Sequence, residues 1–184
     1  MKNLFISKKI ILIFIPILSL YFGFLFGEDL STGGSKKDFL RTFAAVEDFS
    51  NFIYNTTYQY TRHFPFHYLF LSIPHIFFND VYLTRLAYLI FSLTFPFFVY
   101  LNLCKFYESQ KINNLILSLS LLFLPFFRAS AIWPNAHLTA LIFLLIANYF
   151  YIINIKSNNF FNKFFNIFYL LHSILRSFFY ILFS

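Results

Sequence analysis

The sequence predicts an all-α membrane protein: a polytopic helix bundle with five or six membrane segments and an outer-face loop that contains an amphipathic surface helix. Of the 184 residues, 59% are hydrophobic and only 11% are charged, whereas roughly a quarter of the residues in a soluble domain carry charge. The mean hydropathy is +0.68. Uncharged apolar runs recur along the whole chain, so we treat residues 1–184 as a single membrane domain.

The same composition excludes several other classes of protein. Disorder requires low hydrophobicity and high charge, and a single Cys rules out a disulfide framework. The formal net charge of +7 comes from Lys and Arg residues scattered between apolar runs, whereas a nucleic-acid-binding surface would cluster them. We therefore expect the lipid bilayer, and no nucleic acid, as a partner. Cys104 lies inside an apolar run and is interpreted as a small buried hydrophobe.

Residues 10–27 form the first apolar run, and Lys2, Lys8 and Lys9 precede it. A signal peptide would have a shorter apolar core and a small-residue cleavage site, which this run lacks. The run predicts a retained transmembrane helix whose N-terminus is cytoplasmic by the positive-inside rule. The chain is thus expected to be a multi-pass protein of a bacterial cytoplasmic (inner) membrane, with the next loop in the periplasm or a lumen.

That loop, residues 28–63, is the long polar segment of the chain. Ser35 followed by Asp38 resembles a capping box, with Asp in place of the usual Glu. Beyond it, apolar residues fall on one helical face: Phe39, Phe43, Val46, Phe49 and Ile53. The pattern predicts a short helix that either lies along the membrane surface or packs on the protein's own core.

Further apolar runs cover residues 86–104, 112–127, 129–155 and 160–184; the last of these carries Lys163 near its start and Arg176 within it. Residues 64–79 are short and contain two prolines, so this segment either crosses the membrane, re-enters it or lies at its interface. Crossing would put four lysines outside, against the positive-inside rule: Lys105, Lys111, Lys156 and Lys163. The chain ends within apolar sequence, and we expect it to be the N-terminal part of a longer protein.

The acidic pair Glu28-Asp29 directly follows the first predicted helix and is the strongest candidate for a catalytic site. A carboxylate at the membrane boundary can act as a general base on an acceptor while a lipid-linked donor lies in the adjacent leaflet. It can also hold a divalent cation against a phosphate; apart from such a cation we predict no cofactor and no metal site. The alternative is that both acids are solvated boundary residues.

Three basic residues surround the start of the next apolar helix: Arg62, His63 and His67. Arg62 can clamp a lipid phosphate by charge-assisted hydrogen bonds, or it can be an interfacial residue that snorkels. His63 and His67 have the spacing of a zinc pair, but Pro65 lies between them and no Glu intervenes. We therefore assign all three to substrate binding and not to metal.

A second polar stretch, from Arg128 to His137, lies between two apolar runs and contains Trp133, an expected interfacial anchor. Arg128 is a candidate substrate-binding residue at a membrane-edge cavity, with ordinary interface residues as the alternative. Arg176 lies within an apolar run, where a charge is costly and tends to face a protein interior.

The order of these features resembles the N-terminal half of GT-C glycosyltransferases that use polyprenyl-phosphate sugars, a group with the protein mannosyltransferases and the aminoarabinose transferases of lipid A. The resemblance covers roughly residues 10–150. It consists of a first helix that leads into Glu28-Asp29, then His63-Phe64-Pro65-Phe66-His67-Tyr68, then Thr84-Arg85-Leu86-Ala87 and Trp133-Pro134-Asn135. Phe64 stands where the family has the first Pro, and the Pro after Arg-Leu is absent.

The resemblance implies a membrane glycosyltransferase that moves a sugar from a polyprenyl-phosphate donor to a hydroxyl of a lipid, glycan or protein acceptor at the outer face. Glu28 or Asp29 would match the catalytic acid, and Arg62 and His63 would lie near the donor phosphate. Two other classes stay open: a transporter-like bundle, which would carry charges within several spans, and a membrane subunit without catalytic activity.

Overall fold

The computed structural model describes residues 2–47 and 66–156. Within these two ranges every regular element is a helix and none is a strand, so the all-α class is confirmed there. The described helices up to Leu145 belong to one compact unit, and the rest of the last helix begins a second unit. Among the predicted site residues, Arg62, His63 and Arg176 lie outside the described ranges.

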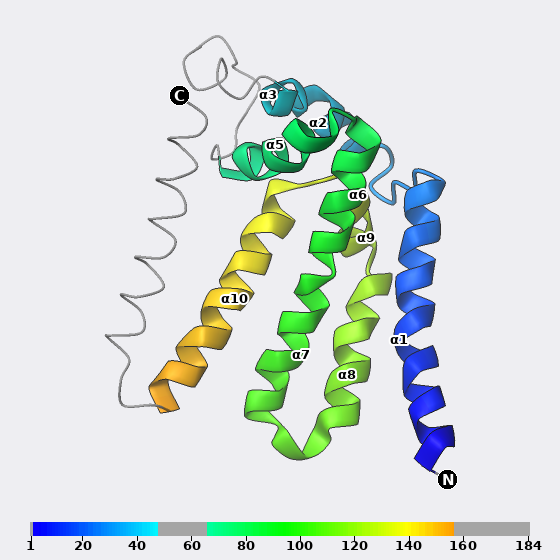
Figure 1. The fold of residues 1–184 in the computed structure, drawn as a ribbon, viewed down its shortest axis with the longest axis vertical. Coiled ribbons are helices and arrows are strands. Elements are labelled where there is room, and N and C mark those ends of the chain that lie inside the picture. Colours follow the sequence, from blue (N-terminus) through cyan, green and yellow to red (C-terminus); the bar gives the residue numbers. More distant parts are fainter. Residues whose placement is uncertain (1, 48–65, 157–184) are drawn as a thin grey trace. The chain divides into compact units, whose positions relative to one another are not determined.

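Long helices run along the first unit and alternate in direction (Figure 1). Helix α1 (Lys2–Leu25) lies beside α8 (Lys111–Ser120) and α9 (Pro125–Ile132). Helices α6 (Val81–Ser92) and α7 (Thr94–Phe106) follow one another end to end, and α8 returns beside α7 after the short 3₁₀ turn η1 (Glu108–Gln110). Helix α10 (Ala136–Lys156) follows α9.

Two helical stretches in the described residues are long and apolar enough to cross a membrane: Val81–Phe106, with 26 residues, and Ala136–Ile153, with 18 residues. A third candidate consists of two helical parts, Glu108–Phe123 and Pro125–Ile132, with a bend of 64° between them. The predicted run at 86–104 lies within the first stretch. The run predicted at 129–155 includes the second stretch, but its residues 129–132 belong to the separate helix α9 (Pro125–Ile132). Five or six membrane segments stay a prediction, because the described residues contain two or three helical stretches that are candidates by length and composition.

The described part of the segment at 64–79 is a helix that is too short to span. Helix α5 (Phe66–Phe78) has 13 residues and contains Pro74, so it is about 20 Å long, against a hydrocarbon core of about 30 Å. In Figure 1 it lies at the end of the unit where α2 and α3 also lie, across the direction of α6. This placement favours the alternative in which the segment does not cross.

Residues of the predicted amphipathic helix do share a buried face, but the helix is broken. Helix α2 (Gly34–Thr42) and helix α3 (Ala44–Glu47) are separated at Phe43. The side chains of Phe39, Phe43 and Val46 are 3%, 5% and 3% exposed, and the Phe43 ring packs against that of His75 on α5. The apolar face therefore covers the protein's own core, which was the second alternative; Phe49 and Ile53 lie outside the described residues.

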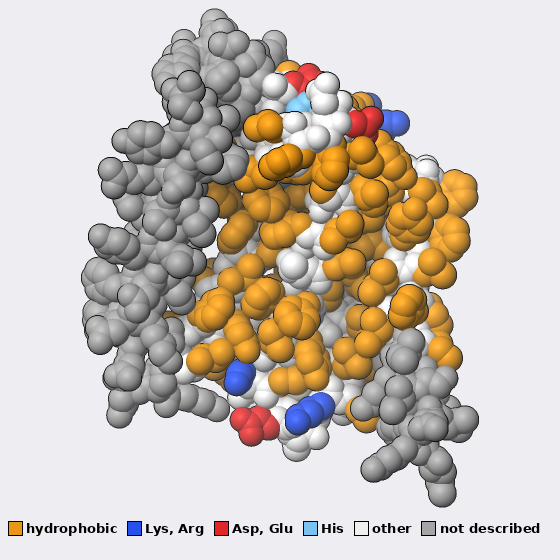
Figure 2. All heavy atoms as spheres, in the orientation of Figure 1, with side chains coloured by type: hydrophobic (Ala, Val, Ile, Leu, Met, Phe, Trp, Pro, Cys, Tyr) orange, Lys and Arg blue, Asp and Glu red, His pale blue; other side chains and the backbone are white. Residues whose placement is uncertain are grey.

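Polar and apolar side chains are distributed as expected for a protein in lipid. Ser92 and Thr84 are fully buried, and Asn102 is 7% exposed and donates to the carbonyls of Phe98 and Leu145. Large apolar side chains instead cover the outside, and charged side chains gather at the two ends of the visible face (Figure 2). Interfaces between membrane helices are rich in small and hydrogen-bonding residues because lipid solvates apolar groups as well as protein does.

A sharp bend after α8 carries the polar stretch at 128–137 into the protein. The short 3₁₀ turn η2 (Leu121–Phe123) ends at Leu124, whose extended backbone is the conformation favoured before a proline. Pro125 then starts α9, where its missing N–H costs nothing. Arg128 thus lies inside a buried helix and not in a loop between two spans, which corrects the predicted boundary.

Candidate functional site

The end of α1 places Glu28 by a glycine turn. Gly27 has a φ of +64°, a left-handed backbone that favours glycine. Its N–H donates to the Phe24 carbonyl at 3.1 Å, and the N–H of Glu28 donates to the Gly23 carbonyl at 2.8 Å. These two bonds form a Schellman motif, which ends a helix and turns the following residue back over it. Glu28 therefore points along the last turn of α1 and not into open solvent.

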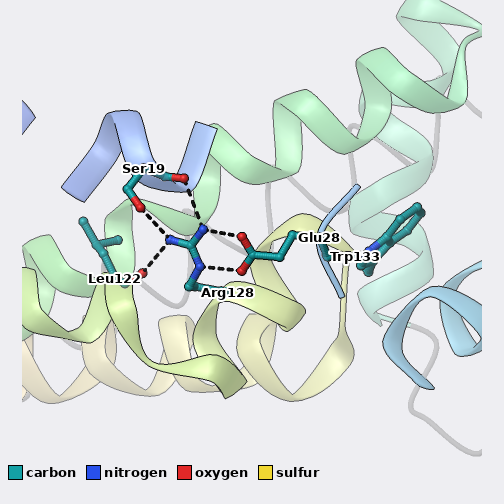
Figure 3. Close-up of polar contacts among 5 residues, drawn as sticks. All are labelled: Ser19, Glu28, Leu122, Arg128 and Trp133. Carbon is teal, nitrogen blue, oxygen red and sulfur yellow. Dashed lines mark hydrogen bonds and ion pairs between the residues drawn. The ribbon is translucent and has the colours of Figure 1, made fainter. Parts of the chain in front are cut away.

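Arg128 on α9 holds the carboxylate of Glu28 with two parallel hydrogen bonds (Figure 3). Its Nε donates to Oε1 at 2.6 Å and its Nη2 donates to Oε2 at 2.5 Å. The same guanidinium donates to the hydroxyl of Ser19 at 3.2 Å and to the Ser19 carbonyl at 3.1 Å. A planar guanidinium matches a carboxylate in this two-pronged geometry, and the side chains of Arg128 and Glu28 are only 9% and 24% exposed. The pair therefore clamps the end of α1 onto α9.

Gly23 leaves the space in which this ion pair forms. A Cβ built on Gly23 would lie 2.6 Å from the Nη2 of Arg128 and closer still to the Oε2 of Glu28. These side-chain ends are pinned to one another and cannot both move aside. Gly23→Ala should therefore destabilise the protein by about 1–3 kcal/mol, although Ala favours helix more than Gly does.

Thermal unfolding in detergent measures this effect, with Gly34→Ala as the control. At Gly34 the nearest heavy atom to an added Cβ is the Ser31 hydroxyl, at 3.3 Å, and we expect a much smaller shift of the melting temperature. Equal melting temperatures for Gly23→Ala and the parent would contradict the role given to Gly23.

Asp29 is turned away from this clamp and supports the start of α2. Its Oδ1 accepts from the amide of Ser31 at 2.9 Å and from the Ser31 hydroxyl, and its Oδ2 accepts from the amide of Lys36 at 2.8 Å. Partial burial raises the pKa of this carboxyl, but the hydrogen bonds from Ser31 and Lys36 outweigh it, and the net pKa is lower than usual. Asp29 is therefore ionised at neutral pH.

These contacts also correct the predicted capping box. The amide of Ser35 donates to the Ser31 hydroxyl at 2.7 Å, and the residue before α2 is Gly33, which has no side chain that could cap the helix. The first amides of α2 are thus satisfied by Ser31 and Asp29, four to seven residues earlier in the chain, and not by Ser35 with Asp38.

Trp133 connects the acidic corner to a second buried arginine. Its indole Nε1 donates to the Glu28 carbonyl at 3.0 Å. The guanidinium carbon of Arg85 on α6 lies 3.5 Å from the centre of the indole ring, and the Nζ of Lys36 lies 5.3 Å from it. Arg85 also donates from Nε to the Ile132 carbonyl at 3.1 Å. Arg85, Trp133 and Glu28 thus form one contiguous group where α1, α6 and α9 meet.

His67, a predicted substrate-binding residue, belongs to a buried polar network between α5, α6 and α10. Its Nδ1 lies 2.9 Å from the Thr139 hydroxyl, and the Thr139 hydroxyl lies 2.9 Å from the Tyr88 hydroxyl. The Tyr88 hydroxyl donates to the Asn135 carbonyl at 3.0 Å. His67 is 6% exposed, so in this state it positions helices and does not face solvent.

The structure brings Glu28 together with Arg128 and Trp133, which lie 100 and 105 residues later in the chain. Glu28 and Arg128 form one ion pair, although their sequence positions predict separate roles, catalytic for Glu28 and substrate-binding for Arg128. Gly23 and Arg85 were not among the predicted site residues. The sequence does contain a signal for Arg85. A charge within an apolar helix is costly, so it is usually found only where it has a partner or a function. For Gly23 no local signal exists.

No group of three or more His, Cys, Asp or Glu side chains that could hold a metal ion occurs within residues 2–47 and 66–156. Compared with models of protein families, with curated proteins and with solved structures, the chain matches none.

Proposed function

We propose that this chain is part of a GT-C-like membrane glycosyltransferase that moves a sugar from a polyprenyl-phosphate donor to a hydroxyl acceptor at the outer face of the membrane. The observation that carries the proposal is a cluster of charged residues at the end of α1. Glu28, Trp133 and Arg85 contact one another in series, and Asp29 is the next residue after Glu28 in the chain. Such a cluster combines a proton acceptor with basic groups that can stabilise a leaving phosphate.

Within the acidic pair, the contacts favour Asp29 as the base. Both carboxylate oxygens of Glu28 accept from Arg128 in a largely buried ion pair, which leaves little freedom to take a proton from an acceptor. Asp29 has no ion-pair partner within the described ranges, and its Oδ2 accepts a single hydrogen bond there, from the Lys36 amide. We therefore assign proton abstraction to Asp29 and positioning of Asp29 to the Glu28–Arg128 pair.

The donor assay that tests the proposal uses the protein in its native membranes. Polyprenyl-phosphate mannose and polyprenyl-phosphate aminoarabinose are supplied separately, and release of free polyprenyl phosphate is measured, because that product does not depend on the acceptor. We expect release with one of the two donors. No release above that of membranes without the protein would overturn the glycosyltransferase assignment, and a non-catalytic membrane subunit would become the better hypothesis.

The side of the membrane is tested separately. The turn between α7 and α8 carries Lys105 and Lys111 and lies at the same end of the unit as the N-terminus of α1 (Figure 1), which agrees with the positive-inside rule if both ends are cytoplasmic. Lys37→Cys in a Cys104→Ser background should then be labelled in intact cells by a reagent that cannot cross the membrane. Lys111→Cys in the same background should be labelled only after permeabilisation, and the reverse pattern would invert the assignment.

A further inference from the structure

Arg85 is a buried cation that lacks an anionic partner in the described part of the chain. The residue is 9% exposed. Its Nη2 is buried without a hydrogen-bond partner, and the ion pair seen within the described ranges, Arg128 with Glu28, does not include it. A buried charge without a partner is strongly unfavourable, and such arginines in membrane proteins usually face a ligand or an ion path.

The guanidinium of Arg85 is nonetheless held in one position. Its face lies over the Trp133 ring at 3.5 Å and its carbon lies 5.0 Å from the centre of the Phe24 ring, while its Nε donates to the Ile132 carbonyl. Stacking occupies the faces of the guanidinium and leaves the donors in its plane available. A fixed fork of N–H donors is the geometry that recognises a phosphate.

The surrounding charges favour an anion as well. The two nearby acids are already engaged, since Glu28 pairs with Arg128 and Asp29 accepts from Ser31 and Lys36. The ammonium of Lys36 lies 5.3 Å from the centre of the same Trp133 ring. Arg85 lies one turn inside the start of α6, about 6 Å along its axis, which is a depth that a lipid headgroup can reach from the membrane surface.

We propose that Arg85, with Lys36 beside Trp133, binds a phosphate group, either the headgroup of a phosphate-bearing lipid or free phosphate. Arg85 supplies the in-plane donors and Lys36 adds a screened charge from the surface. The indole of Trp133 stacks against the guanidinium and fixes its orientation. This inference deepens the proposed sugar transfer and rests on it for the lipid source of the phosphate, because Arg85 belongs to the cluster proposed to stabilise the leaving phosphate. Phosphate binding itself can be measured without sugar transfer.

Trp133 is the single Trp of the chain, so its fluorescence reports on this site directly. The whole protein in neutral dodecyl maltoside micelles is titrated with dodecyl phosphate in one arm and with inorganic phosphate in the other. We expect a saturable change in the fluorescence of Trp133. Saturation by dodecyl phosphate alone identifies a lipid headgroup as the source, and equal affinity for both probes identifies free phosphate.

Variants test the two cations individually. Arg85→Gln should weaken binding roughly 10- to 100-fold, the effect of losing a charge-assisted hydrogen bond, and Arg85→Lys should recover only part of it because the planar fork is lost. Lys36→Gln should weaken binding about 2- to 5-fold, as for an exposed charge near an aromatic ring. Lys37→Gln, the matched control on the same helix, should bind as the parent does.

Absence of saturation with both probes, or unchanged affinity in Arg85→Gln, would overturn the proposal. If Arg85→Gln does not fold, the comparison of Lys36→Gln with Lys37→Gln decides instead, and equal affinities in these two variants would overturn it. Saturable binding by a protein that consumes no sugar donor would leave this site in place while the proposed transferase activity fails.

Discussion

Replacing Glu28 with Ala should destabilise the protein by roughly 3–5 kcal/mol, because the substitution leaves the buried guanidinium of Arg128 without its carboxylate. The Arg128 side chain is 9% exposed, and its remaining donors reach Ser19, which is neutral. Unfolding in mixed micelles, followed by helix content, measures the change.

The double variant Glu28→Ala/Arg128→Met should recover much of this loss. Removing both charges also removes the desolvation cost of the pair, and Met fills much of the space of the Arg side chain. The gain offsets part of the cost of the space that the smaller Ala leaves at position 28. Glu47→Ala, an exposed acid on α3, is the control and should stay within about 0.5 kcal/mol of the parent. A single Glu28→Ala variant as stable as the Glu47→Ala variant would show that the clamp does not hold α1.

The largest effect on activity is expected for Asp29→Asn. If Asp29 is the base of the proposed transferase, an amide of the same size cannot accept the proton, and release of polyprenyl phosphate should fall by about 10²–10⁴-fold. The pKa of Asp29 is lower than usual because of its hydrogen bonds to Ser31 and Lys36, so the carboxylate stays charged as the pH falls from 7 to 5. We therefore expect no loss of activity from protonation of Asp29 in that interval.

Asp29 also supports the first turn of α2, and this second role needs a control. Ser31→Ala removes the hydroxyl that donates to Asp29 and that accepts from the Ser35 amide, but it keeps the carboxylate. If Asp29 acts chemically, Ser31→Ala should retain most of the activity while Asp29→Asn loses it. Equal losses in the two variants, or full activity in Asp29→Asn, would contradict the assignment of Asp29 as the base.

Local patterns in the sequence were sufficient for the fold class and for several elements. Long runs of apolar residues predict helices, and the stretch Val81–Phe106 includes the run predicted at 86–104. The spacing of Phe39, Phe43 and Val46 predicted the face that the structure buries. Such features depend on neighbouring residues alone, so periodicity reveals them. Membrane crossing by five or six segments, the side of the membrane and the activity stay predictions.

Tertiary structure alone decided what the charged residues do. Glu28 and Arg128 are 100 residues apart, and no local pattern says that a Schellman turn at Gly27 and a bend at Pro125 bring them together. Gly23 matters only because another helix places an arginine against it. The stacking of Arg85 on Trp133 likewise joins two helices. The spacing of apolar residues along the chain predicts which of them are buried. The partner of a buried charge depends on helix packing, because only packing determines which groups share a site that water cannot reach.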